Sequence, residues 1–158
     1  MEKIVETFKG ASQAPVVSWD DGAKMSLYRN CEYGYQLPYP EKWNRVTVDD
    51  TVANASFKGD GITVAVNAFK DGLGLDAFAD KRTQAWQIEP VSSRDQQRDG
   101  KRLIAYEYDN PEAVYVFWQE GEYNLELAVT GDQAEQFIVG TGFFTEFNTN
   151  IAGTQICE

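Results

Sequence analysis

The stretch YGYQLPYPEKW, residues 33–43, decides the fold. Its large apolar residues recur at every second position, at Tyr33, Tyr35, Leu37 and Tyr39. This period of two is typical of a strand that turns one face toward a core. So many aromatic residues could mark a ligand site or only the beginning of that core.

The residues before this stretch complete a hairpin. Met25 and Leu27 alternate with polar residues in the same way, and the polar turn 29–32 separates the two runs. Pro38 and Pro40 have no backbone N–H to donate to a neighbouring strand. We therefore expect the two prolines to end the pairing, so that the chain leaves the sheet at 41–43.

Strand and helix patterns continue through the middle of the chain. The turn Gly59-Asp60-Gly61 separates two apolar runs, and Leu75 to Trp86 follows the 3.6-residue period of a helix. Four later runs are joined by short turns, which favours antiparallel pairing. The predicted strands are Val46 with Val48, 52–57, 62–69, 91–96, 101–108, 113–120 and 123–129.

A closing helix is predicted after these strands. Thr130-Gly131-Asp132-Gln133 fits a capping box, in which the threonine hydroxyl accepts from the Gln133 N–H. We attribute the tolerance of Gly140 and Gly142 in this helix to close packing against the sheet. The predicted buried stripe is Ala134, Phe137, Ile138, Thr141 and Phe144, and the tail from Asn148 is expected to be irregular.

This order of elements resembles the PsbP-like family, named for an extrinsic subunit of photosystem II, whose fold is shared with the Ran-binding Mog protein. The residues that carry the likeness are Tyr33 to Pro40 with Trp43, Leu75 to Trp86, and Tyr123 to Leu127 with 133–147. The resemblance implies an α+β fold in which an antiparallel sheet is sandwiched between helices. It also implies a non-enzymatic protein, exported or held at a membrane by a lipid on an upstream cysteine.

The domain division follows from the extent of the likeness. We assign 1–23 to an N-terminal extension, 24–147 to the PsbP-like domain and 148–158 to a C-terminal tail. The N-terminus shows no signal-peptide pattern, so the protein is either cytoplasmic or has lost its signal. The resemblance favours an extracytoplasmic protein: secreted, periplasmic or a lipoprotein.

Composition excludes several classes of function. The 158 residues suit one domain, and 25 acidic against 14 basic residues give a formal charge of −11. Such a charge disfavours nucleic acid, and the lysines are scattered along the chain. The chain has no histidine, which removes the usual zinc sites and histidine-based nucleophile pairs.

The two cysteines leave two alternatives open. Cys31 and Cys157 could form one disulfide closing a loop of about 125 residues, or remain two thiols. Sequence alone does not decide between them, because a disulfide needs Cα atoms within about 7 Å.

Candidate site residues come from the aromatic set. Strand and helix periods place most of these residues in a core, but they account least well for Trp19 and Trp43. We therefore predict a binding surface at Trp19, Trp43 and Tyr39. No catalytic residue, metal site or cofactor is predicted, because the paired acids read as solvated turns. We expect a monomer with an unknown protein partner. The alternatives are a small apolar-ligand carrier and an intracellular adaptor, and a carboxylate-pair hydrolase ranks last.

Overall fold

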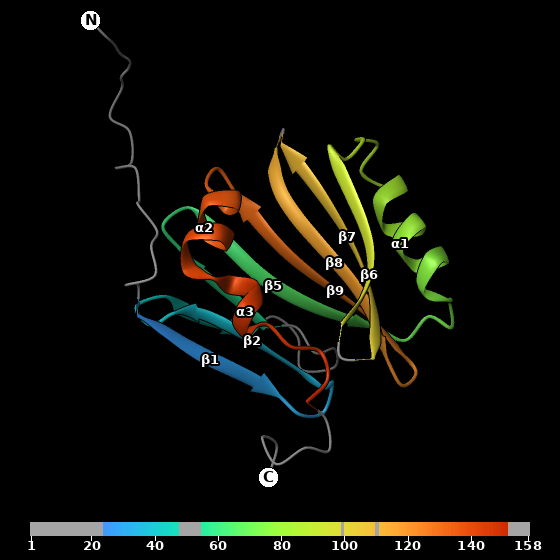
Figure 1. The fold of residues 1–158 in the computed structure, drawn as a ribbon, viewed down its shortest axis with the longest axis horizontal. Helices are drawn as coiled ribbons and strands as arrows, with labels where there is room; N and C mark the ends of the chain where they lie inside the picture. Colours follow the sequence, from blue (N-terminus) through green and yellow to red (C-terminus); the bar gives the residue numbers. More distant parts are fainter. Residues whose placement is uncertain (1–23, 48–54, 99, 110, 152–158) are drawn as a thin grey trace, which may run out of the picture.

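The computed structural model describes residues 24–47, 55–98, 100–109 and 111–151. Seven strands form one antiparallel sheet in the order β3-β4-β5-β9-β8-β7-β6, and β1 with β2 forms a separate antiparallel hairpin (Figure 1). The strands of the large sheet are β3 (Asn44–Thr47), β4 (Ala55–Gly59), β5 (Ile62–Phe69), β6 (Ser92–Arg98), β7 (Lys101–Asp109), β8 (Glu112–Glu120) and β9 (Tyr123–Gly131).

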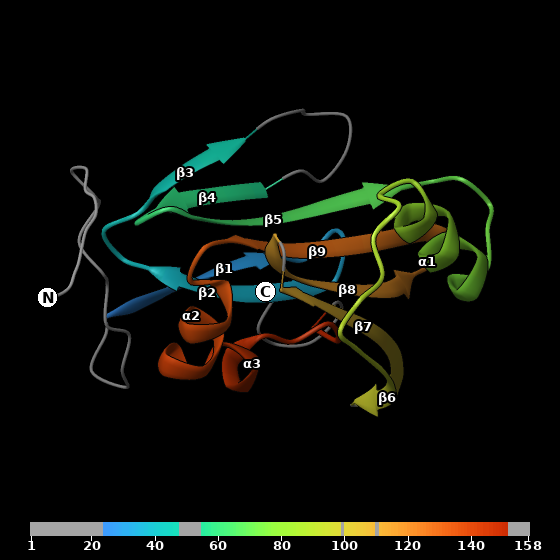
Figure 2. The same cartoon turned by 90° about the horizontal axis from the view of Figure 1, so that it is seen from above.

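Other elements cover both faces of this sheet. Helix α1 (Leu75–Gln84) packs on one face, where Leu75, Phe78 and Ala79 meet Ile104 and Phe117. The opposite face carries α2 (Ala134–Thr141), α3 (Phe143–Glu146) and the hairpin of β1 (Met25–Asn30) and β2 (Tyr35–Pro40) (Figures 1 and 2). The predicted α+β sandwich is confirmed. In addition to the helices α2 and α3, the β1–β2 hairpin forms part of the layer that covers this face.

The alternation predicted for the middle strands is confirmed in β5. Ile62, Val64, Val66 and Ala68 are buried, and the residues between them are half-buried. The turn before β5 is Asp60-Gly61, and both residues have positive φ, 55° and 80°. Two successive positive φ values define the turn that matches the twist of a two-residue hairpin.

The two prolines of β2 do not end its pairing with β1, so that prediction is wrong. Pro38 and Pro40 both lie opposite residues of β1. The Gln36 N–H donates to the Asn148 carbonyl on the other edge of β2, at 2.8 Å. Alternate residues of a strand direct their N–H groups to the same edge. The prolines therefore lack donors only on the edge away from β1, where the ladder does not need them.

The predicted capping box at the closing helix is also wrong. Thr130 stays in β9, where it pairs with both neighbouring strands, and α2 begins at Ala134. Its N-cap residue, Gln133, makes no side-chain cap hydrogen bond. Instead the Glu135 N–H donates to the Glu112 carboxylate at 2.7 Å. Strand β8 thus supplies the acceptor that satisfies a free donor in the first turn of α2.

Gly142 divides the closing helix into two. Its φ of 64° and ψ of 36° are left-handed, and it ends α2 and precedes α3. A Cβ at this position would meet nothing nearer than Thr145 Oγ1 at 3.7 Å. Our explanation by close packing is therefore wrong for Gly142, because the left-handed backbone is what favours glycine here.

The packed fold continues beyond the predicted domain end at Phe147. Asn148 bridges to Gln36, and the Ile151 N–H donates to the Gly34 carbonyl at 3.3 Å. Thr149 and Ile151 are buried. The first residues of the predicted tail therefore belong to the core. No helix in the described ranges is both long and apolar enough to cross a membrane.

Candidate binding groove

Trp43 is a core residue. Only 6% of it is exposed, and its ring stacks on Phe137 of α2 with centroids 5.2 Å apart. The indole N–H donates to Asp60 Oδ2 at 2.9 Å. A Cβ on Gly59 would lie 2.2 Å from Trp43 Cδ1, so the β4–β5 turn needs glycine to admit the ring. Trp43 thus closes over the edge of the core and offers no open surface.

The other two predicted binding residues do not complete a site with it. Tyr39 is half-buried and stacks on Phe57, with ring centroids 4.2 Å apart. Trp19 lies outside the described residues. The aromatic stretch around β2 is therefore mainly structural.

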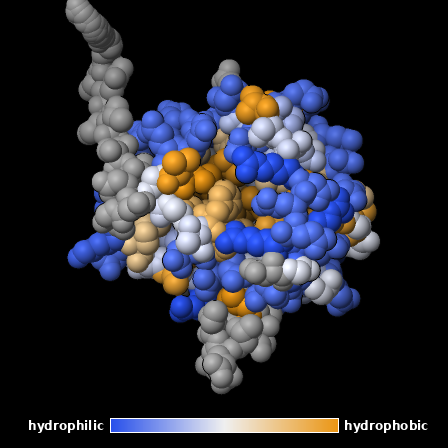
Figure 3. Space-filling model, viewed as in Figure 1, coloured by the Kyte–Doolittle hydropathy of each residue, from blue (hydrophilic) through white to orange (hydrophobic). Residues whose placement is uncertain are grey.

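An open cavity of about 160 Å³ lies on the face that α3 only partly covers. Figure 2 shows β6 at the end of the curved sheet, bending toward the side that carries α2 and α3. Figure 3 shows the hollow at the centre of this face, with hydrophobic atoms in it and hydrophilic atoms around it. We call this cavity the β6–α3 groove. It is lined by Ser92, Arg94, Gln96, Arg98, Leu103, Ala105, Glu107, Val114, Val116 and Phe144.

The floor of the β6–α3 groove is apolar because alternate residues of β7 and β8 face it. Leu103 and Ala105 come from β7, Val114 and Val116 from β8, and Phe144 of α3 forms the opposite wall. Phe144 is half-buried against the main core. Leu103, Val114 and Val116 belong to the buried core, and Ala105 is half-buried, so the groove lies directly over the outer layer of the core.

The rim of the groove comes from β6. The even-numbered positions of this strand place Arg94, Gln96 and Arg98 on the groove side. Arg98 donates from its guanidinium to the Phe144 carbonyl and so joins the edge strand to α3.

The charges at the rim are mostly uncompensated. Arg94 is exposed and has no carboxylate or hydrogen-bond partner among the described residues. The partner of Arg98 is a neutral carbonyl. The Ser92 hydroxyl donates to Glu107 Oε1 at 2.8 Å, which occupies one oxygen of the only carboxylate among the described residues that line the groove. The groove therefore presents two cations beside an apolar floor in a chain of net charge −11.

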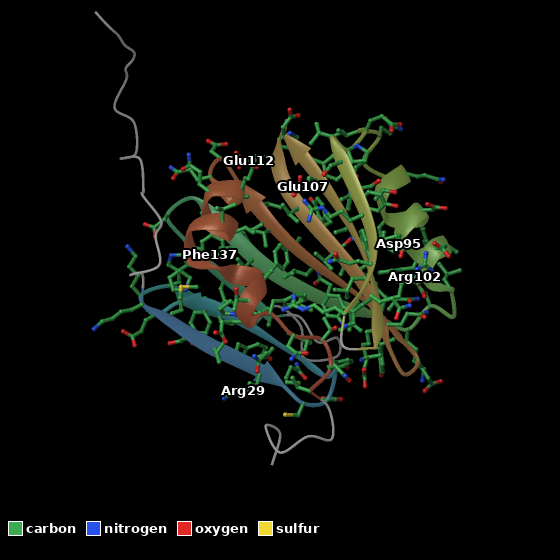
Figure 4. All side chains as sticks on the ribbon, in the orientation of Figure 1. Arg29, Asp95, Arg102, Glu107, Glu112 and Phe137 are labelled. Carbon is green, nitrogen blue, oxygen red and sulfur yellow. The ribbon has the colours of Figure 1, made fainter. Side chains whose placement is uncertain are left out.

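The opposite face of the sheet holds charges that are already paired. Glu126 is buried under α1, and Arg82 donates to both of its oxygens at 2.8 and 3.0 Å. The pKa of Tyr115 is raised, mainly by burial and further by the charge of Glu126. On the surface nearby, Arg102 bridges Asp76 and Asp95 (Figure 4) and lowers the pKa of both carboxyl groups through hydrogen bonds.

A second cavity on that face is too small for a ligand. Its volume is about 30 Å³, which leaves room for no more than a few water molecules. It is lined by Trp86, Ile88, Tyr108, Pro111, Ala113 and Tyr115. We therefore treat it as a packing defect beyond the end of α1.

The structure also places one of the two cysteines and some of the acidic residues that the sequence singles out. Cys31 takes part in a disulfide, and the only other cysteine of the chain, Cys157, lies outside the described residues, so their pairing stays a prediction. Glu120 pairs with Lys101, and Glu122 lies 3.5 Å from Lys70. Within the part of the chain that the structure describes, no three metal-ligating side chains come together.

Comparison with known proteins places the architecture in a class. The chain has the PsbP-like fold. The solved structures it resembles include the solution structure of cyanobacterial PsbP (CyanoP) from Synechocystis sp. PCC 6803, with a TM-score of 0.58 and 13% sequence identity. The match covers 89% of this chain and 98% of that one. No protein-family model and no curated protein matches the sequence.

Sequence reasoning missed the β6–α3 groove. The one available signal is that the two arginines of SSRDQQR occupy the same face of a strand, while Asp95 occupies the other. Such a polar run is ordinary for an exposed edge strand. Only the curvature of the sheet brings this face of β6 opposite Phe144.

Proposed function

We propose that this chain is a non-enzymatic binding domain that acts through contact with a partner protein at the β6–α3 groove. The observation that carries the proposal is the open cavity between β6 and α3, whose apolar floor consists of half-buried Ala105 and of the core residues Leu103, Val114 and Val116. Open apolar hollows rimmed by polar groups are typical of interaction sites. The fold-level resemblance to an extrinsic protein family supports the same class of role.

The size of the groove favours a partner side chain over a small-molecule cargo. A cavity of about 150 Å³ accommodates a molecule the size of benzene. Ligand pockets for drug-sized molecules usually span about 300–1,000 Å³. At about 160 Å³, the groove suits one aromatic or branched aliphatic side chain, so protein contact is favoured over the carrier function.

Two further features support a non-enzymatic, extracytoplasmic role. The chain has no histidine, and Arg82 pairs with the buried carboxylate of Glu126, so neither charge is left poised for proton transfer. The disulfide at Cys31 favours an oxidising compartment, because structural disulfides are rare in the cytosol. We propose that the domain works there as a monomer.

A peptide-display selection tests the proposal. A library of random twelve-residue peptides is selected on the full chain and on the Ala105→Trp variant, whose indole fills the groove. Ser93→Trp is the matched control, because Ser93 is exposed on the opposite face of β6. We expect enrichment on the wild type and on Ser93→Trp, and its loss on Ala105→Trp. Equal enrichment on all three proteins, or none on the wild type, contradicts the proposal.

A further inference from the structure

We infer that the segment recognised by the β6–α3 groove carries an apolar side chain next to one or more carboxylates. This inference rests on the proposed function and adds the chemistry of the partner. The apolar side chain would enter between Phe144 and the floor residues Ala105 and Val116, and a carboxylate would pair with Arg94.

The arrangement of the two arginines supports this pairing. Arg94 and Arg98 lie on the same face of β6 with Gln96 between them, which separates their backbones by about 13 Å at the usual rise of a strand. A short extended peptide spans this distance with five residues, because about 13 Å corresponds to four steps of about 3.3 Å, and its first, third and fifth side chains point to the same side. Its central side chain would then lie over the floor while its acidic residues reach the rim.

Arginine chemistry makes a carboxylate the favoured partner group. A guanidinium offers five N–H donors in a planar fork that matches the two oxygens of a carboxylate. Arg94 has none of these donors engaged by a described residue, and Arg98 donates to the Phe144 carbonyl, which leaves its charge unpaired. An incoming carboxylate would therefore gain charge-assisted hydrogen bonds without displacing an existing ion pair.

The net charge of the protein argues for a basic partner, and this is the competing possibility. Charges separated by more than about 8 Å are largely screened at physiological ionic strength. The charged residues that line the groove are Arg94, Arg98 and one described carboxylate, Glu107, whose Oε1 already accepts from Ser92. Local charge therefore outweighs the distant acidic residues, and the occupant should be acidic.

The same display library tests the inference on charge variants. Arg94→Glu reverses the charge at the rim. Arg29→Glu makes the same change in net charge at an exposed position of β1, in the hairpin and away from β6 (Figure 4). Peptides enriched on the wild type and on Arg29→Glu should be acidic beside an aromatic or aliphatic residue, and those enriched on Arg94→Glu should lose that bias.

The binding affinities of synthesised peptides test the same inference quantitatively. Replacing the acidic residues of the best wild-type binder by their amides should weaken binding about fivefold, and Arg94→Glu should weaken the acidic peptide roughly tenfold. Arg29→Glu should leave both affinities unchanged. Equal binding of the acid and amide peptides, or equal losses in the two arginine variants, would overturn the inference while leaving the groove intact as a binding site. The absence of any groove-dependent peptide would instead overturn the proposed function.

Discussion

At the residue scale, Trp43 shows how one side chain joins parts of the fold that are distant in sequence. It stacks on Phe137 of α2 and donates to Asp60 in the β4–β5 turn. Its place after a proline-containing strand marked it as hard to assign to the core by spacing, and the structure buries it at the edge of the core. That burial depends on Gly59, whose missing side chain leaves room for the indole.

Replacing this tryptophan should therefore cost stability rather than binding. We expect Trp43→Ala to lower the free energy of unfolding by about 3–5 kcal/mol, because it removes a large ring from a packed core. Trp43→Phe should cost less, because it keeps a ring against Phe137 and loses chiefly the hydrogen bond to Asp60, worth about 1 kcal/mol. Urea denaturation followed by far-ultraviolet circular dichroism measures both. A loss below about 1 kcal/mol for Trp43→Ala would contradict the packing role.

At the element scale, the presence of each helix or strand was easier to predict than the residues at which it begins and ends. Alternation and the 3.6-residue period correctly predicted β5 and α1. The prolines of β2 were wrongly predicted to end its pairing, because the effect of a proline depends on which edge of the strand forms the ladder. Thr130 was wrongly predicted to cap a helix, because it continues the pairing of β9 with β8. Both features depend on tertiary structure, which the local sequence does not determine.

An ion pair between Arg82 and the buried Glu126 adds to the apolar contacts that hold α1 on the sheet. We expect Arg82→Met to destabilise the protein by roughly 3 kcal/mol, because it leaves the Glu126 carboxylate buried without its partner. The double variant Arg82→Met with Glu126→Leu should recover most of this loss, since apolar pairs often replace buried ion pairs at little cost. Thermal and urea unfolding of the two variants measure the difference. A double variant no more stable than Arg82→Met would contradict this account.

The surface bridge of Arg102 between α1 and β6 predicts a dependence on acid pH. The pKa values of Asp76 and Asp95 lie below the ordinary value of 3.8 because Arg102 donates hydrogen bonds to both carboxylates. Carboxyl groups with a lowered pKa in the folded state contribute stability that is present above about pH 4 and disappears as the pH falls through the lowered values. Arg102→Met should therefore make stability less dependent on pH below about 4. Urea midpoints measured across that range check it, and identical profiles for both proteins would count against the bridge.

At the scale of the whole molecule, the order of elements predicted the fold but not the groove. The hairpin, the middle helix and the closing strand follow from patterns readable in the sequence, and they combine into the PsbP-like fold. The groove arises where β6 faces Phe144, through the curvature of a seven-stranded sheet. No local pattern in the polar strand Ser92–Arg98 encodes that approach.

The disulfide predicted between Cys31 and Cys157 is also a property of the whole chain. Closing a loop of about 125 residues should stabilise the folded state by about 4–5 kcal/mol through loss of entropy in the unfolded chain. Peptide mapping by mass spectrometry without reduction should recover one peptide pair containing both cysteines, and reductant should lower the urea midpoint. Two free thiols in the folded protein would show the pairing to be wrong.

The central claim, that the β6–α3 groove is the binding site, is tested most directly by nuclear magnetic resonance. Amide chemical shifts of the labelled full chain are recorded while the best acidic peptide from the display selection is added. The account predicts that the largest changes fall on Arg94, Ala105, Val116 and Phe144, and that Ala105→Trp abolishes them. Changes confined to α1 and its face of the sheet, or unaltered by Ala105→Trp, would contradict it.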